Sequence, residues 1–259
     1  MNVRKAAVAN LFYPGNLEDL SQLLEELFAP FTTEKKCRCI AAITPHAGYI
    51  YSGSTAAEAF AKIDFDGFDN LLLMGPAHRV PLRGLAVPCS TKFATPMGNY
   101  PLATDLIKQL VENGFAIYDD KAHLNEHSLE VQIPFLQHLG VDIPLIPVVA
   151  GWSSPQSVAN VIDFICSRSN TLVIVSSDLS HFHTYLEAKR IDQRTTDRII
   201  NMETDIQPEE ACGCTAINGL LYWLKKSRSS IQTVSQCNSG DTAGDKQRVV
   251  GYASYIVYQ

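Results

Sequence analysis

Three short apolar runs, each followed closely by a histidine, narrow the possible folds of this chain. The runs are residues 39–43, 71–74 and 172–175. Apolar side chains at every position, rather than at alternate positions, are typical of strands buried on both faces of a parallel sheet. His46, His78 and His181 come soon after the three runs. Ligands bind at the carboxyl ends of strands in open α/β sheets, so we expect these three histidines to share one site.

Segments with helical periodicity alternate with the apolar runs, which predicts an α/β fold. The clearest amphipathic helix covers residues 17–28, with leucines three or four positions apart. Further helices are expected at residues 54–63, 102–113, 128–139, 157–167, 187–201 and 208–225, and further strands at 84–88, 144–150 and 249–257. A capping-box pattern places the start of the second helix at Ser54. Residues 91–99 show no clear periodicity, and we expect there a loop that could line the site.

The chain shows no internal repeat and no linker, so residues 1–259 are expected to form a single domain. Its sheet should be mostly parallel or mixed, with helices on both faces. A chain of 259 residues can bury a sufficient core without disulfides. The seven cysteines are therefore expected to be free thiols or metal ligands.

Charge and hydropathy exclude several classes of function. The net charge of -6 is mild and the basic residues are scattered, so nucleic-acid binding is not expected. No run of about 18 apolar residues could span a membrane. Residues 1–5 lack the apolar core of a signal peptide. We therefore expect a cytoplasmic protein.

For an isolated histidine we favour a structural role, and we assign that role to His123 and His138. The three histidines at strand ends are better candidates for chemistry. Imidazoles combined with one sulfur or carboxylate suit iron, zinc or copper. Asp178 could ligate a metal, orient a histidine or cap a turn. Orientation is the simplest of these roles, because functional imidazoles usually donate their second N–H to a carboxylate or carbonyl.

Two further stretches carry reactive side chains. Residues 126–130 (Glu-His-Ser-Leu-Glu) could support metal ligands or clamp a substrate, or they could place acids at a helix N-terminus. Cys212 lies near the N-terminus of a predicted helix, where a thiol has a lowered pKa suited to ligation or redox chemistry. Cys214 is better interpreted as a small buried residue. Cys37 and Cys39 lack the spacing of a zinc site and are expected to be buried or edge thiols.

Several common catalytic signatures are missing from the sequence. It contains no Gly-x-Gly-x-x-Gly after a strand, no P-loop, no His-Glu-x-x-His and no Gly-x-Ser-x-Gly. Chemistry that depends on a nucleotide, and α/β-hydrolase chemistry, are therefore not favoured.

Four motifs together resemble the Memo family. They are Thr-Pro-His-Ala-Gly-Tyr-Ile-Tyr-Ser-Gly at 44–53, Gly-Pro-Ala-His at 75–78, Glu-His-Ser-Leu-Glu-Val-Gln-Ile-Pro-Phe-Leu at 126–136 and Ser-Ser-Asp-Leu-Ser-His at 176–181. Residues 212–213, 238–241 and 250–252 extend the resemblance over nearly the whole chain. The first motif is the most specific.

The resemblance implies a fold similar to that of class III extradiol dioxygenases, which are non-haem iron enzymes that cleave catechol rings. It implies that His46, His78 and Cys212 are metal ligands, with Cys212 at the position of a glutamate in the dioxygenases. His181 would be the catalytic base, with Asp178 beside it. A thiolate in place of a carboxylate departs from the ring-cleaving enzymes and favours iron, copper or zinc.

Tyr51, His127 and Glu130 lie within the matching motifs, and we expect them to contact substrate. The expected function is that of a metal-dependent oxidoreductase using iron or copper, with zinc possible. A non-catalytic metal-binding or peptide-binding adaptor using the same cleft is the alternative. A thiol-redox role for Cys212 and Cys214 ranks last, because a disulfide between such close cysteines would be strained.

Family resemblance also suggests partners. Many prokaryotic members are associated with a radical-SAM protein and a third protein, in systems of the AmmeMemoRadiSam type. Eukaryotic members are described as metal-binding redox proteins and as phosphopeptide-binding adaptors. The short loops of this chain are similar to those of the prokaryotic branch, so a radical-SAM protein and a third system component are the expected partners.

Overall fold

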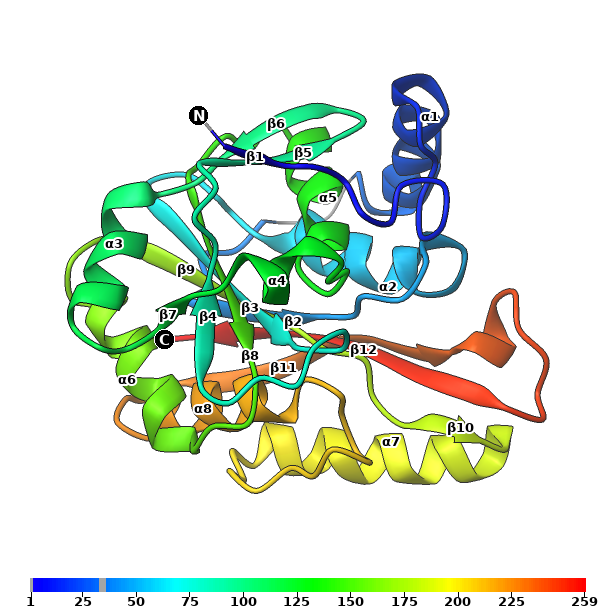
Figure 1. Ribbon diagram of the computed structural model, residues 1–259. Helices are drawn as coiled ribbons and strands as arrows, with labels where there is room; N and C mark the ends of the chain where they lie inside the picture. Colours follow the sequence, from blue (N-terminus) through cyan, green and yellow to red (C-terminus); the bar gives the residue numbers. More distant parts are fainter. Residues whose placement is uncertain (1, 33–35) are drawn as a thin grey trace.

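Four buried parallel strands form the centre of a large mixed sheet. In spatial order they are β2 (Ala41–Thr44), β9 (Thr171–Ser176), β3 (Asn70–Pro76) and β8 (Leu145–Ala150). Except for Asn70, every residue in them is buried, as the unbroken apolar runs predicted. Their carboxyl ends meet at one edge of the sheet (Figure 1). The computed structural model describes residues 2–32 and 36–259.

Antiparallel strands extend this core on both sides. The long strand β12 (Val249–Tyr258) runs antiparallel to β2, and it also pairs with β11 (Ser230–Asn238) and β10 (His181–His183). On the far side, β4 (Leu85–Val87) is antiparallel to β8 and parallel to β7 (Ile117–Tyr118). The sheet is therefore mixed, which was one of the two expected arrangements.

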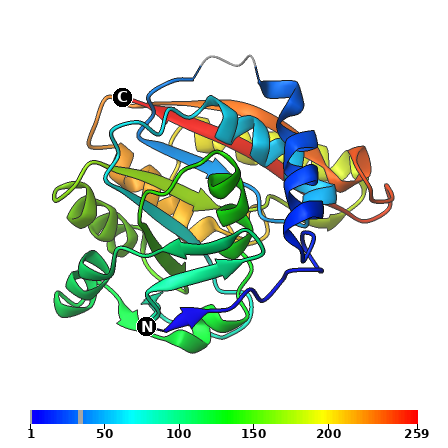
Figure 2. The ribbon, with the colours of Figure 1, turned by 90° about the horizontal axis from the view of Figure 1, so that it is seen from above.

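Helices cover both faces of the sheet. One face carries α1 (Leu17–Phe28), α2 (Tyr49–Lys62) and α5 (Ile133–His138), which pack against one another (Figures 1 and 2). The other carries α6 (Pro155–Cys166), α7 (Tyr185–Ile200) and α8 (Cys214–Leu224). Helix α3 (Thr104–Glu112) lies beside β7 and β8, and the short α4 (Asp120–Leu124) lies beside β4. The predicted α/β fold is thus confirmed.

The predicted start of α2 was wrong. The helix begins at Tyr49, five residues before Ser54, with Gly48 as its N-cap and without a capping bond from a side chain. Gly53, inside the helix, faces α1 so closely that an added Cβ would lie 2.8 Å from Leu27 Cδ1. Packing against α1 therefore outweighs the low helix propensity of glycine.

Two other predicted helices are shorter than expected. The helix expected from residue 208 begins only at Cys214. The helix expected over 128–139 is split into a 3-10 turn (Glu130–Gln132) and α5, which has Pro134 in its first turn. Proline fits there because the first N–H groups of a helix have no partner within it.

The loop expected over residues 91–99 is instead part of a small second sheet. Here β5 (Lys92–Thr95) forms a hairpin with β6 (Gly98–Pro101) and pairs in parallel with β1 (Val3–Arg4). Phe93 packs against Arg4 and His123, and Thr95 donates a hydrogen bond to Gln137. The segment therefore holds the N-terminal strand and does not line the site. Within the described residues, no helix is long and apolar enough to cross a lipid bilayer.

Candidate functional site

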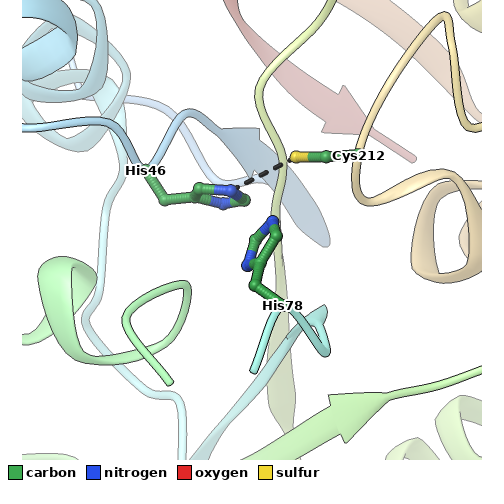
Figure 3. A group of neighbouring side chains, drawn as sticks. All are labelled: His46, His78 and Cys212. Atoms are coloured by element: carbon green, nitrogen blue, oxygen red, sulfur yellow. Dashed lines mark hydrogen bonds between the residues drawn. The ribbon is translucent and has the colours of Figure 1, made fainter. Parts of the chain in front are cut away.

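The site lies where β2, β3 and β9 end. His46 lies two residues beyond β2, His78 lies two residues beyond β3, and Cys212 lies in the loop before α8. Figure 3 shows the three side chains pointing toward one another. One ligand atom from each falls within 4.8 Å of the other two. His46 is buried, Cys212 is half-buried and His78 is exposed, so the cluster opens to solvent on the side of His78.

His46 is held at both ring nitrogens. Its Nδ1 lies 2.9 Å from Ser176 Oγ at the end of β9, and its Nε2 lies 3.2 Å from Cys212 Sγ. Burial lowers the pKa of His46 well below its ordinary value, and the nearby His78 and His127 lower it further. The imidazole is therefore neutral.

His78 is oriented by the carboxylate of Glu126. One oxygen of Glu126 lies 2.9 Å from His78 Nδ1, and the other accepts the backbone N–H of His78 at 2.6 Å. Burial alone would raise the pKa of Glu126, but the hydrogen bonds from His78 outweigh it and lower the pKa to about 2. The ionised carboxylate accepts Nδ1–H, so the lone pair of a neutral His78 lies on Nε2. Of the roles left open for residues 126–130, Glu126 therefore has that of orienting a candidate ligand.

Cys212 is fixed by backbone contacts with the end of β9. Its N–H donates to Asp178 O at 3.2 Å, and the N–H of Asp178 donates to its sulfur at 3.3 Å. Burial, together with the charge of Asp178, raises the pKa of the thiol. The expected lowering of this pKa by the helix N-terminus was wrong, because desolvation dominates. A protonated Cys212 thiol can donate to Nε2 of His46.

Asp178 does not orient an imidazole as expected. Its Oδ1 accepts the backbone N–H of His46 at 2.7 Å, so it holds the turn after β2. Burial raises the pKa of Asp178 to about 7. His181 lies on β10, which pairs with β12, and it is half-buried. Burial lowers the pKa of His181 as well.

One of the three predicted substrate contacts, His127, lies against the cluster. The ring of His127 stacks on His78 at 4.5 Å and lies 5.4 Å from the ring of His46. Burial lowers the pKa of His127 to about 4. Tyr51 is half-buried in the first turn of α2, and its contact with substrate stays a prediction.

The third predicted contact, Glu130, needs correction. Its side chain is fully buried and faces the N-terminal segment instead of the cluster. The partners of its two oxygens are the Arg4 guanidinium, the Tyr13 hydroxyl and the N–H groups of Ala7 and Val8. A carboxylate with all these bonds is a structural anchor with no free position for a substrate.

The sequence predicted no individual role for Ser128, Gln132 or Ser176, although all three lie in the quoted motifs. In the structure they form a buried polar network behind His46. The only signal was indirect: Ser176 ends a run of apolar strand residues, and Gln132 is a polar residue within an apolar stretch.

The arrangement suits the binding of a metal ion. Two imidazole nitrogens with lone pairs and one sulfur face a common point, and this donor set is typical of sites for borderline metals such as zinc, iron(II) and copper. Because His78 is exposed, a further ligand can reach this side of the cluster from solvent.

Comparison with known proteins supports the resemblance seen in the motifs. The family model described as Memo-like protein matches residues 4–256. A MEMO1 family protein of Thermoplasma volcanium is 34% identical over 265 residues, covering 98% of each chain. A MEMO1 family protein of Aquifex aeolicus is 31% identical over 268 residues, covering 99% of each.

A solved structure shares the fold. An uncharacterized protein from Escherichia coli K12 aligns with a TM-score of 0.52 at 13% identity, covering 86% of this chain and 100% of its own. At this level of identity the likeness concerns architecture alone.

Proposed function

Because this chain belongs to the Memo-like protein family, we propose that it binds one metal ion through His46, His78 and Cys212 and acts as a metal-dependent oxidoreductase. The observation that carries the proposal is the convergence of the three ligand atoms within 4.8 Å of one another. Iron and copper are the favoured metals and zinc is possible, since the donor set combines two imidazoles with one sulfur.

The surrounding residues prepare these ligands for a cation. Glu126 holds the proton of His78 on Nδ1, which leaves Nε2 free. Cys212 would have to lose its proton, so binding would release a proton and weaken at low pH. A bound iron or copper ion would supply Lewis acidity and redox chemistry at this point.

His181 and His127 are the proposed groups that act on a substrate. The neutral imidazole of His181 can accept a proton from a bound substrate and return it later. His127 stacks on His78 and could accept a hydrogen bond from the same molecule.

Metal analysis of protein purified without oxygen tests the proposal. Near-stoichiometric metal is expected in the wild type, and little in the His46→Ala and Cys212→Ser variants. His138→Gln and Cys89→Ser serve as matched controls, since His138 packs on Phe28 and Cys89 is exposed. Unchanged metal content in both His46→Ala and Cys212→Ser would contradict the proposed site.

A non-catalytic binding role for the same cleft is the second candidate. Ile50 and Phe182 are 63% and 61% exposed, and they neighbour the segments that carry His46 and His181. Exposed apolar side chains of this kind are common where a peptide or protein binds. Oxygen consumption by the iron-loaded protein in the presence of reducing aromatic substrates would favour the enzyme. Binding without any turnover would favour the adaptor.

A further inference from the structure

Behind His46, the hydroxyl of Ser176 makes three hydrogen bonds with a single proton to give. Its oxygen lies 2.6 Å from the carbonyl oxygen of Ser128, 2.8 Å from Nε2 of Gln132 and 2.9 Å from Nδ1 of His46. A carbonyl oxygen can only accept. The Ser176 proton is therefore committed to Ser128, and the other two partners must donate to the hydroxyl.

The orientation of Gln132 is determined in the same way. One terminal atom of its amide lies 2.8 Å from the carbonyl oxygen of Pro45, which can only accept a hydrogen bond. This atom must therefore be the nitrogen, Nε2. Its Oε1 accepts the hydroxyl of Thr44 at 3.0 Å. Nε2 has one further proton, which it donates to Ser176. Gln132 and Ser176 are 0% exposed, so water does not offer alternative partners.

We infer that Ser176 and Gln132 are positioning residues that hold the proton of His46 on Nδ1 and thereby keep the lone pair of Nε2 directed at Cys212. The opposite tautomer would leave Nδ1 without a proton. Ser176 would then have to turn its own proton away from Ser128, placing two acceptor oxygens 2.6 Å apart in a buried site. A buried polar group left without a partner is strongly unfavourable, so the tautomer with the proton on Nδ1 is preferred.

The network joins the two candidate ligands as well. The segment that supplies Gln132 and the Ser128 carbonyl also supplies Glu126, which holds the proton of His78 on Nδ1. Ser128 Oγ in turn donates to the carbonyl of Pro76, two residues before His78. One short stretch, residues 126–132, therefore sets the tautomer of both imidazoles. The importance of this stretch for metal binding rests on the proposed function. The inferred tautomer of His46 does not depend on that function.

The tautomer can be measured without metal. In long-range proton–nitrogen NMR spectra of the metal-free protein, His46 is assigned by the signals missing from His46→Ala. We expect Nδ1 to show the shift of a protonated ring nitrogen and Nε2 that of an unprotonated one. A proton found on Nε2 of His46 would overturn the inference, whether or not the protein binds metal.

Metal affinity provides the second readout. Ser176→Ala should weaken binding of cobalt(II) or zinc by about 10- to 100-fold, the usual effect of losing a partner behind a ligand. It should also change the cobalt absorption spectrum. The matched control is Ser254→Ala, because Ser254 on β12 is equally buried but its hydroxyl contacts no partner among the described residues. Ser176→Thr keeps the hydroxyl and should restore most of the affinity.

The two proposals fail in different ways. Equal metal affinity in Ser176→Ala, Ser254→Ala and wild type would overturn the positioning role while leaving the metal site intact. A wild type that binds no metal would contradict the proposed function, and the NMR measurement would still decide the tautomer of His46.

Discussion

At the scale of single residues, burial lowers the pKa of several histidines in this protein. His123 shows the effect away from the candidate site. It is 2% exposed, and its Nε2 lies 3.1 Å from the carbonyl oxygen of Ala86, to which it donates. Burial lowers its pKa from 6.5 to about 4. The structural role expected for His123 agrees with these contacts.

This pKa predicts a pH dependence of stability. Between pH 6.5 and 4 the unfolded chain binds a proton at His123 and the folded protein does not, so acidification favours unfolding. His123 alone should remove about 3 kcal/mol across this window. Asp178 and Asp192, whose pKa values burial raises to about 7 and about 6, act in the opposite direction. Wild type must therefore be compared with a variant that lacks only His123.

We expect urea unfolding of metal-free protein to show this comparison directly. At pH 7, His123→Gln should be less stable than wild type because a fitted side chain is lost. At pH 4.5 the difference should shrink by about 2–3 kcal/mol, since only wild type carries the penalty of an unprotonated histidine. A stability difference that is the same at both pH values would contradict the assignment.

At the scale of elements, close backbone approach positions the loop that carries Cys212. Gly213 lies against the end of β9, and its N–H donates to Ser177 Oγ at 2.9 Å. A Cβ added at Gly213 would lie 2.6 Å from Ser177 Cβ and 2.8 Å from the carbonyl oxygen of Ser176. Backbone atoms cannot move away as a flexible side chain can, so only glycine lets this loop reach β9.

Substitution of this glycine should displace the neighbouring thiol. Gly213→Ala is expected to lower the free energy of unfolding by about 1–3 kcal/mol, as overpacking does, and to weaken metal binding. Gly48→Ala is the matched control, because its nearest contact would be an ordinary 3.5 Å. Metal titration and urea unfolding of both variants test this. If the two variants have the same stability and the same metal affinity, the loop before α8 can move to accommodate a side chain at position 213, and the prediction is wrong.

At the scale of the whole molecule, the N-terminal segment is fastened to the middle of the chain. Arg4 forms a buried ion pair with Glu130, and it also donates to the backbone carbonyls of His123 and Glu126. The pair joins residues 126 positions apart. Because Glu126 and Glu130 bracket the segment that carries His127, this anchor also holds the wall of the site in place.

Loss of the anchoring charge should be costly. Glu130→Gln leaves Arg4 buried without its counter-charge and should lower the free energy of unfolding by about 3–5 kcal/mol. Glu112→Gln, which breaks the exposed pair with Lys108, should cost less than about 1 kcal/mol. Urea unfolding compares the two. The folded Glu130→Gln variant should still bind metal. Loss of metal without a change in stability would show that Glu130 acts at the site and is not a structural anchor.

Apolar patterning explains why much of the architecture could be predicted. The helix at residues 17–28 has its predicted bounds, and the apolar run 172–175 lies within the strand Thr171–Ser176. Burial on one stripe or on two faces leaves a direct pattern in the sequence. The strand β11 was missed because its polar side chains pair through backbone hydrogen bonds, which any residue can make. The hairpin at residues 92–101 was missed for the same reason.

The sequence by itself determined that a buried parallel sheet would form and that His46 and His78 would meet at its carboxyl edge, because side-chain periodicity and strand direction are local properties. Only the tertiary structure decided the partners of these groups. Glu126 orients His78, Glu130 binds Arg4, and the Cys212 thiol is desolvated beside His46. Hydrogen bonds and desolvation depend on atoms that are distant in the chain, and no local pattern records them.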